Sequence, residues 1–291
     1  MFSEFKLFRD VALHKSLSRA AAANGISQPA ASQNIQELER RLGTELLDRS
    51  RRPLSLTEAG KLYLEFCRDV VRRAEEFEAS LDNLRGAATG ELRIASIYSL
   101  ALSEMGRVRG EFEEHCPGVE LKVEYLRPDK VYESVVNEAA DLGLVSYPEA
   151  TRFISVIPWR EERMAVALAP EHRLAGRRRL KPQDLEGEDF VAFDSDLAIR
   201  RNLDRFLKDQ NVDVHITMNF DNIQMVKEAV ALGHGISILP DRTMQNELEQ
   251  GRLKCVGLDA PLVRPVGVVH RKRKKFSRAA GAFLRALPVA G

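Results

Sequence analysis

The feature that most constrains the fold of this chain is one long helical pattern, which runs from Glu58 to Arg85 without a proline and with Gly60 as its single early glycine. Apolar residues recur in it at spacings of four, four, seven, four and three, at Leu62, Phe66, Val70, Phe77, Leu81 and Leu84. These spacings place the apolar side chains in one stripe on one helix. Such a helix extends about 40 Å at 1.5 Å per residue, which is more than a small neighbouring domain can cover. The stripe therefore predicts pairing with a second copy of the chain.

The residues after this helix indicate a domain boundary. The segment from Arg85 to Gly90 consists mainly of small residues and contains two glycines, a composition typical of linkers. We therefore expect a helical domain at residues 1–60, a dimerising linker helix with its hinge at residues 61–89, and a larger domain at residues 90–291. A chain of 291 residues is long enough for two domains that each have a core.

The larger domain shows strand patterns that alternate with helix patterns. Strands are expected at residues 92–96, 119–125, 142–145, 164–168, 190–193, 214–218, 236–239 and 266–269. Helices are expected at residues 101–114, 130–140, 199–211, 222–232 and 276–287. This alternation predicts a parallel α/β sheet, whose ligands bind at the carboxyl ends of the strands.

The first 60 residues contain two short helices around a turn. Ser18 can cap a first helix over residues 19–23, and Asn24-Gly25 suits a turn that requires a positive φ. Ser27 can cap a second helix, with Pro29 in its first turn. Two helices joined in this way form a helix-turn-helix, the arrangement that places a second helix in the major groove of DNA.

The second helix has two distinct faces. An apolar stripe that should pack on the domain consists of Ala31, Ile35, Leu38 and Leu42. The other side carries residues that can bind base edges and phosphates, namely Gln28, Pro29, Ser32, Gln33 and Gln36, with Ser27 at the start. Arg49, Arg51 and Arg52 lie in a proline-containing turn that could form a wing against the phosphate backbone. An ordinary amphipathic helical pair and a solvated arginine run are the alternatives.

These segments together resemble the N-terminal signature of the LysR-type transcriptional regulators. The resemblance rests on Ser27-Gln28-Pro29-Ala30-Ala31-Ser32, Ile35, Leu38-Glu39, Leu42-Gly43, Leu46-Leu47-Asp48-Arg49 and Leu56-Thr57-Glu58-Ala59-Gly60. It implies a winged helix-turn-helix, a long linker helix that dimerises, and a two-lobed α/β effector domain like that of periplasmic binding proteins, usually in a homotetramer. It also implies a first lobe at residues 90–162 and 264–291 and a second lobe at residues 163–263. Two residues depart from the family pattern, because Asn24 stands where an apolar residue is usual and Gln33 where an arginine is common.

The resemblance further implies an effector cleft between the lobes. In the family, the loop after the first strand supplies hydroxyl and N–H donors at the start of a helix, and here that loop is Ser96-Ile97-Tyr98-Ser99. Ser99 is the first candidate and Ser96 the second, and free N–H groups with the positive end of the helix dipole would favour an anion. The alternative is that Ser99 only caps the helix. Other effector candidates at loop ends are Tyr98, Arg127, Ser146, Tyr147, Asp194, Ser195 and Asn222.

Composition and the remaining motifs exclude several classes of protein. The 44 Lys and Arg residues nearly balance the 43 Asp and Glu residues, which is compatible with a small nucleic-acid-binding module on a near-neutral domain. The sequence lacks a membrane-spanning run and a secretory signal, so we expect a cytoplasmic protein without a membrane partner. The three cysteines are far apart, the histidines lack metal-ligand spacing, and no phosphate-binding loop or nucleophile elbow occurs. We therefore expect no enzyme, no cofactor and no metal site.

The resulting hypothesis is a LysR-type regulator that binds a pseudo-palindromic promoter in double-stranded DNA as a dimer of dimers. A small-molecule effector between the lobes would bias the geometry of the assembly, and RNA polymerase is a further candidate partner. Two alternatives remain open. One is a small-molecule-binding protein whose N-terminal helices only oligomerise it, and the other is an α/β enzyme with a helical extension.

Overall fold

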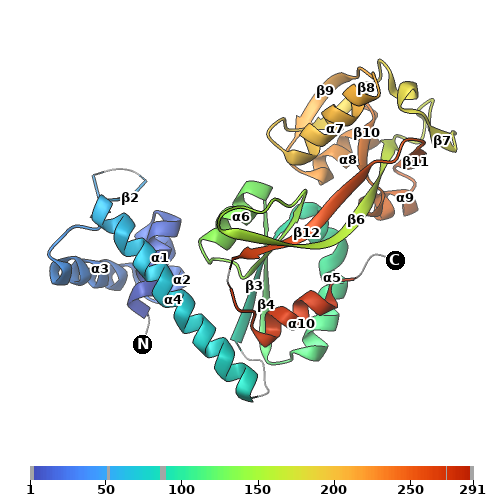
Figure 1. Cartoon of the computed structure of the whole chain (residues 1–291). Helices are drawn as coiled ribbons and strands as arrows, with labels where there is room; N and C mark the ends of the chain where they lie inside the picture. Colours follow the sequence, from blue (N-terminus) through green and yellow to red (C-terminus); the bar gives the residue numbers. More distant parts are fainter. Residues whose placement is uncertain (1–2, 51–52, 86–89, 273, 289–291) are drawn as a thin grey trace. The chain divides into compact units, whose positions relative to one another are not determined.

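The computed structural model describes residues 3–50, 53–85, 90–272 and 274–288. The chain forms two compact units, and the main division between them falls between residues 87 and 88 (Figure 1). None of the helices in the described part of the chain combines the length and apolar character that a membrane span requires.

The first unit is a winged helix-turn-helix. Its helices are α1 (Ser3–His14), α2 (Leu17–Ala23), α3 (Gln28–Leu42) and α4 (Glu58–Arg85). The short strands β1 (Leu47–Asp48) and β2 (Ser55–Leu56) pair antiparallel and form the wing. The helices and the wing enclose a core that includes Phe8, Val11, Ile35, Leu38, Leu46 and Cys67.

The turn between α2 and α3 is built differently from the prediction at one point. Ser16, rather than Ser18, caps α2, because its Oγ accepts a hydrogen bond from the N–H of Arg19 at 3.3 Å. Asn24 Nδ2 donates to Asp10 Oδ2 at 2.8 Å and to the carbonyl of Ala20 at 2.9 Å, so this departure from the family pattern fastens the turn to α1. The predicted roles of Gly25, with φ of +65°, and of Ser27 as the cap of α3 are confirmed.

The long helix α4 begins where the sequence predicts. Thr57 Oγ1 accepts from the N–H of Gly60 at 3.0 Å, which satisfies a donor in the first turn. Gly60 packs so closely on the wing that an added Cβ would lie 2.0 Å from the carbonyl oxygen of Leu46. The apolar stripe is exposed in the single chain, since Leu62, Phe66 and Phe77 are 71%, 53% and 61% accessible.

The second unit contains an eight-stranded mixed sheet. Its strands are β3 (Gly90–Ile97), β4 (Val119–Leu126), β5 (Leu142–Ser146), β6 (Ile154–Leu168), β7 (Arg179–Leu180), β10 (Ser237–Pro240), β11 (Lys254–Leu258) and β12 (Val263–Arg271). The path is β4-β3-β5-β12-β6-β11-β7, and β10 also pairs with β6. The predicted parallel sheet is therefore wrong in part. β12 runs antiparallel to β5 and β6, and β10 and β11 run antiparallel to β6. The chain passes from the first lobe into the second along β6 and returns along β12 in the opposite direction.

Two long strands connect the two lobes of this unit. β6 pairs with β12 over residues 154–163 and with β10 and β11 over residues 164–168, so it passes from the first lobe into the second. The strand predicted at 164–168 is only its final third. Figure 1 shows β6 and β12 side by side between the lobe that holds β3 and β4 and the lobe that holds β8 (Asp189–Phe193) and β9 (His215–Phe220).

Helices cover the strands of both lobes. The first lobe carries α5 (Tyr98–His115), α6 (Pro128–Val136) and α10 (Arg278–Ala286). The second lobe carries η1 (Pro182–Leu185), α7 (Ala198–Asp209), α8 (Ile223–Ala231), η2 (Asp241–Met244) and α9 (Gln245–Glu249). The second lobe has its own apolar core, which includes Val166, Phe190, Val191, Leu203, Val230 and Ile238.

Candidate DNA-binding surface and effector cleft

The helix α3 presents a polar face to solvent along its N-terminal half. Ser27, Gln28, Pro29, Gln33 and Gln36 are exposed and Ser32 is half-buried. Among the described residues, the side chains of Gln28, Ser32, Gln33 and Gln36 have no hydrogen-bond partner within the chain, so their polar groups are available to an external one.

The opposite face of α3 packs on the domain. Ala31, Ile35 and Leu38 are buried in the core of the first unit, as predicted. Leu42 is 45% exposed, so its predicted place in the core is wrong. It lies in the last turn of α3, immediately before the left-handed residue Gly43 ends the helix.

Glu39 fixes the wing to α3. Its Oε1 accepts from the backbone N–H groups of Leu46 and Leu47 at 2.9 and 3.0 Å, and its Oε2 accepts from Nη2 of Arg49 at 2.7 Å. Arg49 therefore holds the wing in place with its guanidinium. Arg51 and Arg52 lie outside the described residues. Sequence reasoning did not give Glu39 this role, because its partners become neighbours only when the hairpin folds back on α3.

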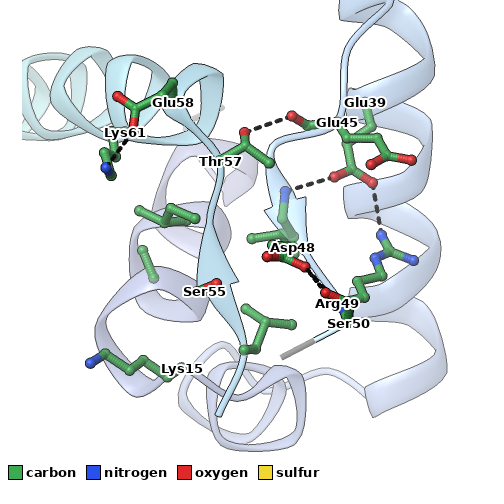
Figure 2. A pocket seen from close by; sticks show the side chains of 14 residues that line it. Lys15, Glu39, Glu45, Asp48, Arg49, Ser50, Ser55, Thr57, Glu58 and Lys61 are labelled. Atoms are coloured by element: carbon green, nitrogen blue, oxygen red, sulfur yellow. Dashed lines mark hydrogen bonds and ion pairs between the residues drawn. The ribbon is translucent and has the colours of Figure 1, made fainter. Parts of the chain in front are cut away.

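An open groove of about 960 Å³ lies beside the wing (Figure 2). Acidic and basic side chains occur in its lining in nearly equal numbers, and several pair with each other, as Lys61 does with Glu58 at 2.5 Å. Thr57 Oγ1 donates to the carbonyl of Glu45 at 2.7 Å at its upper edge (Figure 2). This mixed lining favours no particular charge of ligand.

A small cavity of about 60 Å³ lies between the lobes of the second unit. Five of the predicted effector residues line it, namely Tyr98, Ser99, Arg127, Ser146 and Asn222. Its apolar walls come from both lobes and include Ile97, Leu126, Phe193, Leu197 and Ile223. The ends of the strands therefore bring most of the candidates together, as expected for an α/β sheet.

The other four candidates do not line this cavity. Ser96 is fully buried, and its Oγ donates to the carbonyl of Ile97 at 3.2 Å. Tyr147 has a φ of +49° and packs on the core of the second lobe. Asp194 lies at the edge of the cleft, 3.5 Å from Nη1 of Arg127, and Ser195 is exposed.

Arg127 bridges the two lobes. It extends from the start of α6 in the first lobe, and its Nη2 lies 2.7 Å from Asp196 Oδ2 of the second lobe. Its Nη1 lies 3.5 Å from Asp194 and 3.4 Å from Asp221, both also in the second lobe. We call these four residues the interlobe ion cluster. Its three carboxylates already neutralise the guanidinium.

A second arginine, Arg264, also lines the cavity. It is 2% exposed, and its Nη1 donates to Ser99 Oγ at 3.0 Å. Its Nε donates to Glu162 Oε2 at 2.9 Å, and its Nη2 donates to the same oxygen. Glu162 Oε1 accepts in turn from Nη2 of Arg160 at 2.6 Å. Burial alone would raise the pKa of Glu162, but the charge of Arg264 and the hydrogen bonds from both arginines outweigh it and lower that pKa.

Ser99 does not cap α5. The residue before the helix is Ile97, and Ser99 is the second helical residue, so the alternative that it serves only as a cap is wrong. Sequence reasoning missed Arg264 and Glu162. Within the described residues, no group of three His, Cys, Asp or Glu side chains is arranged to hold a metal ion.

Comparison with known proteins matches both units. Residues 85–289 match the LysR substrate binding domain, and residues 2–61 match the bacterial regulatory helix-turn-helix proteins of the lysR family. A RuBisCO operon transcriptional regulator of Allochromatium vinosum is 29% identical over 281 residues, 96% of this chain and 93% of the relative. The HTH-type transcriptional regulator CbbR of Rhodospirillum rubrum is 30% identical over 288 residues, 99% of this chain and 95% of the relative.

Solved structures show the same fold. A full-length OxyR variant from Pseudomonas aeruginosa has a TM-score of 0.79 at 17% identity and covers 99% of this chain and 94% of its own. Full-length CbnR complexed with its target DNA has a TM-score of 0.66 at 19% identity, with 99% of this chain and 98% of CbnR covered. The CcmR regulatory domain of Synechocystis in complex with 2-PG has a TM-score of 0.62 at 26% identity, with 68% of this chain and 96% of that domain covered.

Proposed function

The chain belongs to the LysR family of transcriptional regulators, and we propose that it reads promoter DNA with the exposed face of α3 and responds to an anionic effector in the cleft between its lobes. The unpartnered amides and hydroxyl on α3 carry the first part of this proposal. Side chains of this kind bind base edges and phosphates in the major groove. The residues that we assign to DNA are Ser27, Gln28, Pro29, Ser32, Gln33 and Gln36, with Arg49, Arg51 and Arg52 from the wing.

We assign one function to each of the three predicted segments of the chain. Residues 1–60 would bind DNA, residues 61–89 would dimerise, and residues 90–291 would bind the effector. The passage of β6 from one set of partners to another between Arg163 and Met164 supports a lobe boundary there. As a regulator of promoters, the protein would act in the cytoplasm, with RNA polymerase as a further partner, and it would not catalyse a reaction.

The exposed stripe on α4 supports a dimer. Leu62, Phe66 and Phe77 form an apolar surface on a 28-residue helix that the described residues leave open to solvent. A second copy of α4 is the partner with the matching length and periodicity. Two such dimers would place recognition helices at half-sites on one face of the DNA, as a pseudo-palindromic promoter requires.

The effector assignment rests on the cavity between the lobes. The CcmR regulatory domain was solved with 2-PG, which supports a small-molecule ligand for this domain as well. We assign ligand contact to Tyr98, Ser99, Arg127, Ser146 and Asn222, which share the cavity. The other four candidates would lie near the cavity without contacting the ligand, namely Ser96, Tyr147, Asp194 and Ser195.

A mobility-shift and footprinting experiment with the chain's own upstream region tests the DNA-binding proposal. We expect salt-sensitive, sequence-selective protection in two or more half-sites. Replacing Gln28 and Ser32 with alanine should lower the ratio of specific to non-specific affinity, because each lost base contact contributes about 1–3 kcal/mol of discrimination. Gln245→Ala, at an exposed position at the start of α9 in the second lobe, is the control. Protection that does not depend on sequence would refute the proposal.

A further inference from the structure

We propose that Arg264 recognises the charge of the effector and that the cleft takes a compact oxyanion, such as a carboxylate, sulfate or phosphate group. This proposal rests on the proposed function, because it concerns the same cleft. It adds the residue that selects the charge and the size of the group that fits. Three observations carry it: unused hydrogen-bond donors, incomplete charge compensation and the volume of the cavity.

Some N–H groups of the Arg264 guanidinium do not donate a hydrogen bond within the described residues. It carries five N–H groups, and the hydrogen bonds to Ser99 and Glu162 use three of them. The second N–H of Nη1 and that of Nη2 have no partner among the described residues. Since Arg264 is 2% exposed and lines the cavity, bulk water does not readily satisfy them. A buried donor without a partner is unfavourable, so the site favours a ligand that accepts hydrogen bonds.

The charge of Arg264 is also incompletely compensated. Within the described residues, Glu162 is its one ion-pair partner, and that carboxylate is shared with Arg160. In contrast, Arg127 faces three carboxylates of the second lobe. A ligand anion therefore gains more from Arg264 than from Arg127, although both line the same cavity. Hydrogen bonds between an arginine and an oxyanion are the strong, charge-assisted kind.

The surroundings of Arg264 fit an oxyanion in other respects. Ser99 lies in the first turn of the 18-residue helix α5, whose N-terminal end carries partial positive charge. Ser146 and Asn222 line the same space and can donate further hydrogen bonds. A cavity of about 60 Å³ holds a few water molecules, which corresponds to a compact anionic group and excludes a bulky one unless the lobes part.

The test is calorimetric titration of the full chain at pH 7 with sulfate, inorganic phosphate and acetate, at constant ionic strength. Acetamide serves as the neutral control. We expect saturable binding of at least one anion and none of acetamide. Absence of binding by all three anions would overturn the proposal. The promoter mobility shift is independent of this result, so a protein that binds promoter DNA but none of these anions would refute the inference while the regulator assignment stands.

Three variants separate recognition by Arg264 from a structural role. Replacing both Arg264 with Met and Glu162 with Gln removes the two charges together, while the introduced amide oxygen can still accept from Arg160. We expect at least tenfold weaker anion binding. Glu162→Gln alone should bind the anion at least as tightly as the wild type, because it removes the competing carboxylate. Lys130→Gln removes a positive charge that pairs with Glu133 and does not line the cavity, so it should stay within about threefold of the wild type.

The anion affinities of the variants can contradict the proposal in two ways. Equal loss of binding in Glu162→Gln and in the double variant would show that the ion pair only supports the fold, and would overturn the proposal. Unchanged binding in the double variant would also overturn it. Far-UV circular dichroism and non-specific DNA binding check that each variant is folded. If the double variant does not fold, Arg264→Lys replaces it, with the expectation of at least threefold weaker binding.

Discussion

At the scale of single residues, Glu39 shows how one side chain can position a whole DNA-binding element. It is mostly buried and accepts from two backbone N–H groups and from Arg49. Replacing Glu39 with Ala should lower the free energy of unfolding by about 2 kcal/mol, because two buried donors lose their acceptor. It should also weaken DNA binding, because the wing is no longer fixed to α3. Urea unfolding and mobility shifts measure the two effects.

Glu37 is the matched control for this prediction. It lies on the same helix, but its side chain is 61% exposed and pairs only with Arg40. Exposed ion pairs contribute about 0–1 kcal/mol, so Glu37→Ala should leave the stability nearly unchanged. If both variants lost the same stability, the role assigned to Glu39 would be wrong.

Asp141 links stability to pH. Its carboxylate accepts from the N–H of Arg93 at 2.9 Å and from Nζ of Lys274 at 2.8 Å. Burial alone would raise the pKa of Asp141, but Lys274 and Arg93 outweigh it and lower that pKa in the folded state. The stabilisation is therefore present above the unfolded pKa of about 4 and is lost as the pH falls through the lower folded value.

The substitution Asp141→Asn tests this pH dependence. It should lower the free energy of unfolding by about 2 kcal/mol at pH 7, because hydrogen bonds to a charged acceptor are lost. The difference from the wild type should shrink steadily below about pH 4. Denaturant unfolding at a series of pH values measures this, and a difference that stays constant down to pH 2 would contradict it.

At the scale of elements, the proposed dimer depends on the exposed apolar stripe of α4. A charge in the middle of its exposed stripe should prevent a second copy from packing there. Phe77→Glu should therefore convert a dimer into a monomer in sedimentation velocity at micromolar concentration. Lys61→Glu introduces the same side chain on another side of the helix and should leave the dimer intact. Dimers that persist in Phe77→Glu would place the interface elsewhere.

The sequence predicts those elements whose signals are local. The cap at Ser27, the turn at Gly25 and the stripe of α4 all lie within a few residues of the structure that they specify. The same holds for the cavity residues at strand ends, because the alternation of strands and helices already brings those ends together. Asn222 is predictable for this reason, whereas Tyr98 and Ser99 are expected from the family resemblance.

The elements that the sequence does not reveal depend on distant partners. The first part of β6 contains Arg160 and Glu162, which interrupt an apolar strand pattern although both are buried. They can be buried because Arg264, 102 residues from Glu162 in the chain, completes the ion pair. Without knowledge of that pairing, neither the full strand nor the arginine in the cavity is predictable. The antiparallel return of β12 is hidden for the same reason.

At the scale of the whole effector unit, the interlobe ion cluster joins the two lobes beside the cavity. The cavity is small, and Arg127 and Asp221 of the cluster are part of its lining. Arg127 is partly exposed, so its ion pairs are screened by salt and contribute about 0–1 kcal/mol each. The cluster as a whole therefore influences how often the lobes open.

Removing the charge of Arg127 should make opening more frequent. We expect Arg127→Gln to raise the hydrogen-exchange rate of the amides around Ser99 and Ile199 about fivefold, which corresponds to roughly 1 kcal/mol of lost stabilisation of the closed form. Raising the salt concentration should have the same effect on the wild type and little effect on the variant. Lys130→Gln is the control, because Lys130 pairs with Glu133 inside one lobe. If both variants accelerated exchange equally, the ion cluster would not hold the lobes together, and the closure would depend on the apolar walls of the cavity alone.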